Sequence, residues 1–111
     1  MPAPVIDATV YADLQAATGA EFVIELVQTF FEEAPRTLGE LQAALADGSA
    51  ERFRRAAHSL KTNALTFGAT RLADQARALE LGGLPDDASA LDALRTAYAE
   101  AAAALQEMTR G

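Results

Sequence analysis

Apolar residues recur every three or four positions along most of this chain, in runs that end at glycine or at a turn containing proline. This spacing gathers apolar side chains on one face of an α-helix, whereas no segment alternates apolar and polar residues as a half-buried strand does. The chain also contains 27 alanines, which have the highest helix propensity and let helices pack closely. The sequence therefore predicts an all-α fold built from amphipathic helices.

The breaks between the apolar runs predict five helices. Asp7 and Ser49 are good N-caps for the first and the third of them. Pro35 lies inside the second, where it removes one backbone donor, and we expect one kinked helix there rather than two. The expected ranges are 7–18, 20–47, 49–67, 70–82 and 88–108. Their short links predict an antiparallel four-helix bundle over about residues 20–108, with an additional short N-terminal helix packed over one end.

At 111 residues the chain has about the size of one domain, so we expect a single domain over 1–111 and a monomer. It has no cysteine, which excludes disulfides, thiolate catalysis and cysteine-bound zinc. With a single histidine, a metal site of imidazole ligands is implausible, and we expect no metal. No stretch reaches the roughly 20 apolar residues that span a bilayer, and the first residues do not resemble a signal peptide. We therefore expect a soluble cytoplasmic protein.

Charge is distributed unevenly along the chain. Residues 52–77 hold six basic side chains and one acid, which is a local charge of +5. Residues 1–51 carry −8 and residues 78–111 carry −4, and the formal net charge is −7. Nucleic acids and anionic membrane surfaces demand broad positive charge, so neither is an expected partner. The small basic segment is suited instead to one local anion.

The single histidine, His58, lies in this basic segment, one helical turn before the single lysine, Lys61. In the helix expected at 49–67, apolar residues spaced 4, 3, 4 and 3 apart form a packing face: Phe53, Ala57, Leu60, Ala64 and Phe67. The stripe one position further on is rotated by about 100° and carries Arg54, His58, Lys61 and Leu65, with Arg55 and Thr62 beside it. His58 is therefore expected on the solvent-facing flank of the bundle.

A neutral imidazole in such a place can attack phosphorus, and nearby cations attract the phosphoryl group that it gains. Two unit charges about 4 Å apart near a protein surface interact by roughly 1–4 kcal/mol, which is enough to orient a phosphoryl group without trapping it. Lys61 is the best candidate for this role, and Arg54 and Arg55 are weaker ones. The alternative is that His58 is an ordinary surface residue and the arginines are only solvated.

No second catalytic group stands beside His58 in the sequence. The chain has no glycine-rich phosphate loop, and Ser59 is rotated by about 100° from His58, too far to share a proton easily. General acid–base catalysis needs a second positioned group, so a hydrolase with His58 as its base is disfavoured. We expect a carrier rather than an enzyme.

The run from Ala56 to Ala69, AAHSLKTNALTFGA, resembles the signature of histidine-containing phosphotransfer domains. The upstream segments FVIEL and FFEEAP, and the downstream RLA and LE, extend the resemblance over about residues 19–82. It implies a four-helix bundle in which His58 accepts a phosphoryl group from the aspartate of a receiver domain and passes it to another receiver. The implied partners are receiver domains of hybrid histidine kinases and response regulators, which supply magnesium, so the chain itself needs no cofactor.

The same resemblance assigns roles to other residues. It implies that Lys61 steadies the phosphate and that Gly68 keeps the receiver-docking surface open. Thr62 stands where many members have glycine, which would narrow the range of receivers that dock. Glu80 stands where some members have glutamine, and it either orients the imidazole N–H or is an ordinary surface acid. The expected docking residues are Phe22, Leu26, Ser59, Thr62, Leu65 and Gly68, although Phe22 and Leu26 fit the core equally well.

A binding-only function is the main alternative. The chain would then be a non-catalytic helical adaptor whose basic segment binds an acidic signalling partner without phosphotransfer. His58 would have no covalent role, and partner binding would survive its replacement.

Overall fold

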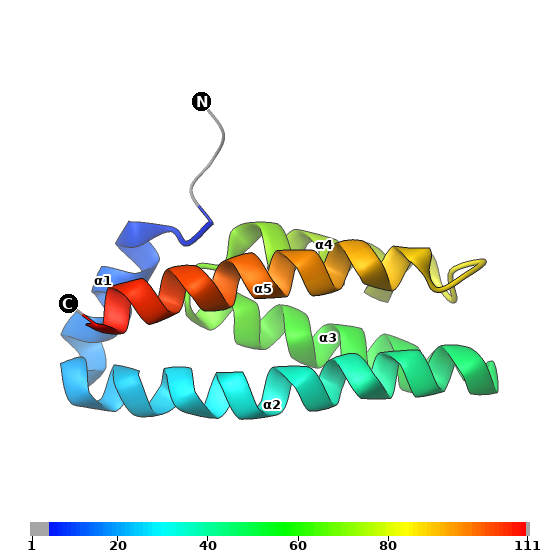
Figure 1. The fold of residues 1–111 in the computed structure, drawn as a ribbon, viewed down its shortest axis with the longest axis horizontal. Coiled ribbons are helices and arrows are strands. Elements are labelled where there is room, and N and C mark those ends of the chain that lie inside the picture. The colour runs from blue at the N-terminus through cyan, green and yellow to red at the C-terminus, as the bar shows by residue number, and fades with distance from the viewer. Residues whose placement is uncertain (1–4, 111) are drawn as a thin grey trace.

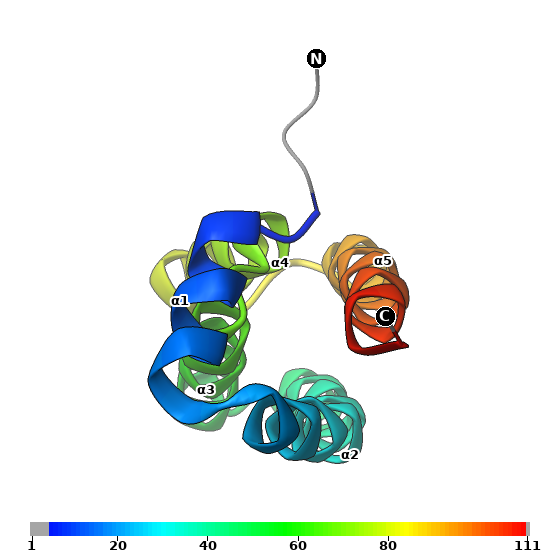
Figure 2. The ribbon, with the colours of Figure 1, turned by 90° about the vertical axis from the view of Figure 1, so that its left-hand side faces the viewer.

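The structure, a computed structural model, describes residues 5–110. This range contains five helices and no strand: α1 (Ala8–Thr18), α2 (Ala20–Asp47), α3 (Ala50–Thr66), α4 (Thr70–Gly82) and α5 (Ser89–Arg110). The chain direction alternates from α2 to α5 (Figure 1), and each of these four helices contacts two of the others around the bundle. α1 lies across one end, where it contacts α2 and α3 (Figure 2). The predicted all-α fold with an additional N-terminal helix is confirmed.

The helix ends follow from the capping residues. The Asp7 carboxylate accepts a hydrogen bond from the backbone N–H of Thr9 at 2.9 Å, and the Ser49 hydroxyl accepts one from Arg52 at 3.4 Å. Both predicted N-caps are therefore confirmed. Gly48 adopts a left-handed conformation at φ 70° and ends α2. Only glycine takes that conformation at little cost, which is why the chain reverses there into α3.

α2 continues through Pro35 as one helix of 28 residues. The proline ring is exposed, and it leaves the Phe31 carbonyl without its usual helical donor. Ala34 and Leu38 on either side of Pro35 are buried, with exposed fractions of 1% and 4%. Their burial holds the helix together across the missing hydrogen bond, so the prediction of a single helix over 20–47 is confirmed.

The core lies along the shared axis of α2, α3, α4 and α5. The predicted packing face of α3 is confirmed, because all five of its residues are buried: Phe53, Ala57, Leu60, Ala64 and Phe67. The Phe30 ring of α2 packs 5.2 Å from the ring of Phe67 and 5.7 Å from the ring of Tyr98 on α5, measured between ring centroids. These contacts tie three parts of the bundle together and leave the opposite face of α3 open.

The first turns of α2 decide between the two positions, surface or core, that the sequence left open for Phe22 and Leu26. Phe22 is 48% exposed and Leu26 is half-buried, whereas Val23 and Val27 are buried. The buried positions continue the face that holds Phe30, since helical residues three and four apart share one side. Phe22 is therefore a surface residue, and Leu26 lies at the edge of the core.

Candidate functional site

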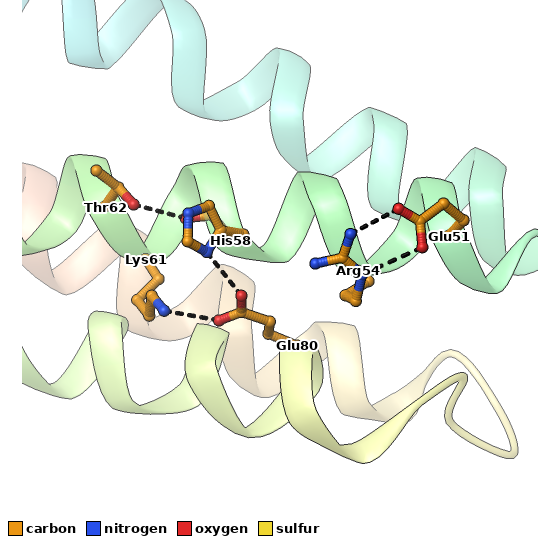
Figure 3. A network of polar contacts seen from close by, with 6 residues as sticks. All are labelled: Glu51, Arg54, His58, Lys61, Thr62 and Glu80. Carbon is orange, nitrogen blue, oxygen red and sulfur yellow. Dashed lines mark hydrogen bonds and ion pairs between the residues drawn. The ribbon is translucent and has the colours of Figure 1, made fainter.

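His58 lies on the flank of α3 that faces away from the core. Its side chain is 55% exposed, so the sequence prediction of a solvent-accessible imidazole is confirmed. The ring nitrogen Nδ1 lies 2.6 Å from Oε2 of Glu80 on α4 (Figure 3). The hydroxyl of Thr62 donates to the His58 backbone carbonyl at 3.0 Å, a contact within α3 that does not involve the ring. The ring is thus held at one nitrogen while its outer edge stays open to solvent.

Glu80 also binds Lys61. The ammonium Nζ of Lys61 donates to Oε1 of Glu80 at 2.7 Å, so the carboxylate bridges the lysine and the histidine (Figure 3). The Glu80 side chain is 10% exposed and the Lys61 side chain 22% exposed. The hydrogen bond from Lys61 is the main reason why the pKa of Glu80 lies below its ordinary value. Partial burial opposes this shift, and the contact with His58 adds to it.

The bridging carboxylate determines which ring nitrogen of His58 carries the hydrogen. With its lowered pKa, Glu80 is ionised near neutral pH, and an ionised carboxylate can only accept hydrogen bonds. Nδ1 must therefore be the donor in the 2.6 Å contact. In the neutral ring this leaves a free lone pair on Nε2. This contact fits one of the two roles expected for Glu80, orientation of the imidazole ring, and that role stays a prediction.

The arginines near His58 are paired with other acids. Arg54 donates to both carboxylate oxygens of Glu51, at 3.2 and 2.6 Å, and Arg55 lies 3.9 Å from the same carboxylate (Figure 3 shows the first pair). Within residues 5–110, no hydrogen bond or ion pair joins Arg54 or Arg55 to His58 or Glu80. Direct phosphate contact by these two arginines stays a prediction, and Lys61 is the cation that the structure brings to the histidine.

The exposed residues among the expected docking set lie on α2 and α3. Phe22 is 48% exposed and Leu65 is 52% exposed, and Ser59 and Thr62 are also exposed. Leu26 lines a hollow of about 180 Å³ between the two helices. Ser59 and Thr62 line one hollow with His58, whereas Phe22 lines a separate hollow at the start of α2. Receiver docking by these residues stays a prediction.

Gly68 does not belong to an open surface, so that prediction is wrong. It is buried, and its backbone accepts a 2.8 Å hydrogen bond from the N–H of Asp7. A Cβ atom at Gly68 would lie 2.9 Å from the Asp7 carbonyl oxygen and 2.9 Å from Cβ of Val10. With φ at 75°, the glycine also takes a conformation that other residues avoid. Gly68 lets the start of α1 pack against the turn between α3 and α4.

The sequence does not predict two residues of α2 that lie in the groove between α2 and α3, beside His58. Glu33 and Thr37 line a hollow of about 400 Å³ together with His58, Ser59, Thr62 and Asn63. The hydrophobic pattern of α2 carries no sign of this, because only its pairing with α3 brings these polar side chains to the histidine. Among residues 5–110, no group of three metal-ligating side chains is present, and no helix is long and apolar enough to cross a membrane.

Comparison with known proteins gives a match to a protein family and to a solved structure. The family model of the Hpt domain matches residues 25–104, which is more than half of the chain. The fold is similar to the crystal structure of histidine-containing phosphotransfer protein B (HptB) from Pseudomonas aeruginosa PAO1. The TM-score is 0.88 at 27% sequence identity, over 98% of this chain and 97% of that one. A search of curated proteins finds no match. The chain belongs to the Hpt domain family.

Proposed function

We propose that this chain is a phosphorelay intermediate that accepts a phosphoryl group on His58 from the aspartate of one receiver domain and passes it to another. The observation that carries the proposal is the 2.6 Å contact between Nδ1 of His58 and Glu80 beside an exposed ring. It leaves the lone pair of Nε2 as the nucleophile, on a side chain that a partner can reach. An adaptor that only binds has no need of a histidine held in this way.

The transfer step needs only His58 and Glu80 of this chain and the aspartyl phosphate of the receiver. The Nε2 lone pair attacks the phosphorus of a receiver aspartyl phosphate, a nitrogen–phosphorus bond forms, and the phosphorus–oxygen bond to the aspartate breaks. The aspartate leaves as a carboxylate, while the hydrogen stays on Nδ1. The ring now carries a positive charge, and the Glu80 carboxylate stabilises it. The same steps in reverse pass the group to the next receiver.

Lys61 would neutralise charge on the phosphoryl group during transfer. Phosphoryl transfer depends mainly on positioning and on stabilising the charge of the equatorial oxygens. Lys61 is held by Glu80 at 2.7 Å, one helical turn from His58, and a fifth of its side chain still reaches solvent. The receiver supplies the magnesium ion and the aspartate. The chain is therefore a carrier whose chemistry is completed by its partner, and we expect it to act as a monomer in the cytoplasm.

Receiver docking would use the α2–α3 face around His58. Phe22, Leu26 and Leu65 would supply apolar contact, with Ser59 and Thr62 nearer to the ring. The Thr62 side chain is exposed and covers part of the surface that a glycine would leave free. We expect it to favour receivers with a small residue at the matching position.

A phosphotransfer profile tests the proposal. The purified chain is mixed with each radiolabelled phosphorylated receiver domain of its host, and label on the chain is followed over time. Fast transfer from one or a few receivers, giving an acid-labile and base-stable product, is the expected result. Binding of a receiver without any transfer of label would favour the adaptor instead.

A further inference from the structure

The groove between α2 and α3 has a basic end. A hollow of about 380 Å³ lies there, and its polar lining comes from Arg36, Thr37 and Glu40 on α2 and from Arg52, Arg55 and Ser59 on α3. Thr37 and Ser59 also line the hollow that contains His58. The basic hollow is thus continuous with the surface beside the histidine, and one arginine of α2 and two of α3 line it.

Two of the three arginines in this hollow have donors to spare. Arg52 is occupied, because it binds Glu40 and Asp47 at 2.9 Å each. Arg36 is exposed and forms no ion pair within residues 5–110, and Arg55 has only the 3.9 Å contact with Glu51. Guanidinium groups bind carboxylates through paired N–H donors. Arg36, which is unpaired within the described range, and Arg55, which is weakly paired, are therefore suited to bind an acidic group.

The opposite end of the groove is lined by apolar and polar side chains but, among the described residues, by no cation. The His58 hollow shares Glu33 and Asn63 with the hollow that contains Leu26, Phe30 and Phe67. From Leu26 to Arg36 is ten residues of helix, or about 15 Å. His58 lies between these ends, so a partner that covers the ring meets two arginines on one side and a surface without cations on the other.

We propose that Arg36 and Arg55 bind a carboxylate side chain of the receiver domain and so set the orientation in which the receiver docks over His58. The inference rests on the proposed function. The charge of the lining supports it, since three arginines and one acid line this hollow in a chain whose formal net charge is −7. A receiver turned end to end would place its acidic group beside Glu33 and apolar side chains, which penalises that orientation.

The test uses the receiver that transfers fastest to the wild-type chain. Initial transfer rates are measured against receiver concentration for the wild type, for the double variant Arg36→Gln/Arg55→Gln, and for the control Arg71→Gln/Arg95→Gln. The control removes the same charge from α4 and α5, where the two arginines bind Glu100 and Gln42. All four side chains are exposed, and circular dichroism confirms that the variants remain helical.

The Arg36/Arg55 variant is expected to raise the KM for the receiver roughly ten-fold, with kcat at saturating receiver unchanged. It should also flatten the salt dependence of kcat/KM between about 50 and about 300 mM salt, which the control should preserve. Equal KM values for variant and control would overturn the inference. A fall in kcat alone would also overturn it, because the arginines would then act on the phosphoryl group. If the wild-type chain takes no label from any receiver, the proposed function itself fails.

Discussion

Glu80 lies 2.6 Å from Nδ1 of His58, although the two residues are 22 positions apart and belong to different helices. The same carboxylate holds Lys61 at 2.7 Å. One acid on α4 therefore positions both the imidazole and the ammonium group on α3. The contact makes Nδ1 the hydrogen-bond donor, and the chemistry proposed for Nε2 depends on it.

The tautomer of His58 is the first testable consequence. The neutral ring should carry its hydrogen on Nδ1, because Glu80 can only accept. Long-range nitrogen–proton NMR spectra of the imidazole distinguish the two tautomers. Glu80→Gln should keep the Nδ1–H form, since its amide oxygen still accepts, whereas Glu80→Ala should lose it. Glu100→Ala, which removes an exposed acid on α5, is the matched control. An Nε2–H tautomer in the wild type would contradict the assignment.

Lys61→Ala should slow phosphotransfer without unfolding the bundle. Lys61 is partly exposed and contributes a charge rather than core packing, so the helical signal should stay unchanged. The expected loss is roughly ten- to a hundred-fold in the transfer rate at saturating receiver, because a cation beside the transferring group stabilises charge in the transition state. Lys61→Arg should recover part of the rate. Unchanged transfer by Lys61→Ala would remove this role.

Glu80 should also make stability depend on pH in the acidic range. Its pKa is lowered in the folded chain, chiefly by the hydrogen bond from Lys61, so the unfolded chain binds the proton more readily. The stabilisation is therefore present above the ordinary pKa of about 4.5 and is lost as the pH falls below it toward the folded pKa. The Tm difference between wild type and Glu80→Gln should be largest near neutrality and shrink below about pH 4.5. A difference that is independent of pH would argue against the ionised bridge.

Two glycines should respond in opposite ways to alanine. At Gly68 an added Cβ would meet Asp7 and Val10 at 2.9 Å, and φ is 75°, so Gly68→Ala should cost about 1–3 kcal/mol of unfolding free energy. Gly39 lies inside α2 with nothing within 4 Å of a Cβ, so Gly39→Ala should stabilise by up to about 1 kcal/mol. Urea unfolding followed by circular dichroism measures both. Equal effects of the two substitutions would refute the packing role of Gly68.

The histidine face was predictable because α3 alone defines it. The spacing of Phe53, Ala57, Leu60 and their partners leaves only one side of the helix for His58, and that side is open in the structure. The start of α2 was harder. Phe22 and Val23 are adjacent, and size suggests burying the phenylalanine, but only the valine continues the face of Phe30. The register of the whole helix decides this choice, not the size of either side chain.

Ion pairs between helices were the other feature that the sequence could not predict. The count of +5 over residues 52–77 omits the acids that pair with those arginines, and two of them, Glu40 and Asp47, lie on α2. The unpaired Arg36 likewise belongs to the acidic N-terminal half of the chain and joins the groove only through the pairing of α2 with α3. Local charge along a sequence therefore overstates the positive field near His58 and misses one of its sources.

Labelling of wild type and His58→Gln by the same phosphorylated receiver tests the central claim most directly. The side chain is exposed, so the variant should fold and bind the receiver as the wild type does. The account predicts an acid-labile, base-stable label on the wild type and none on His58→Gln. Equal labelling of the two proteins would contradict it, because the phosphoryl group would then reside on another residue.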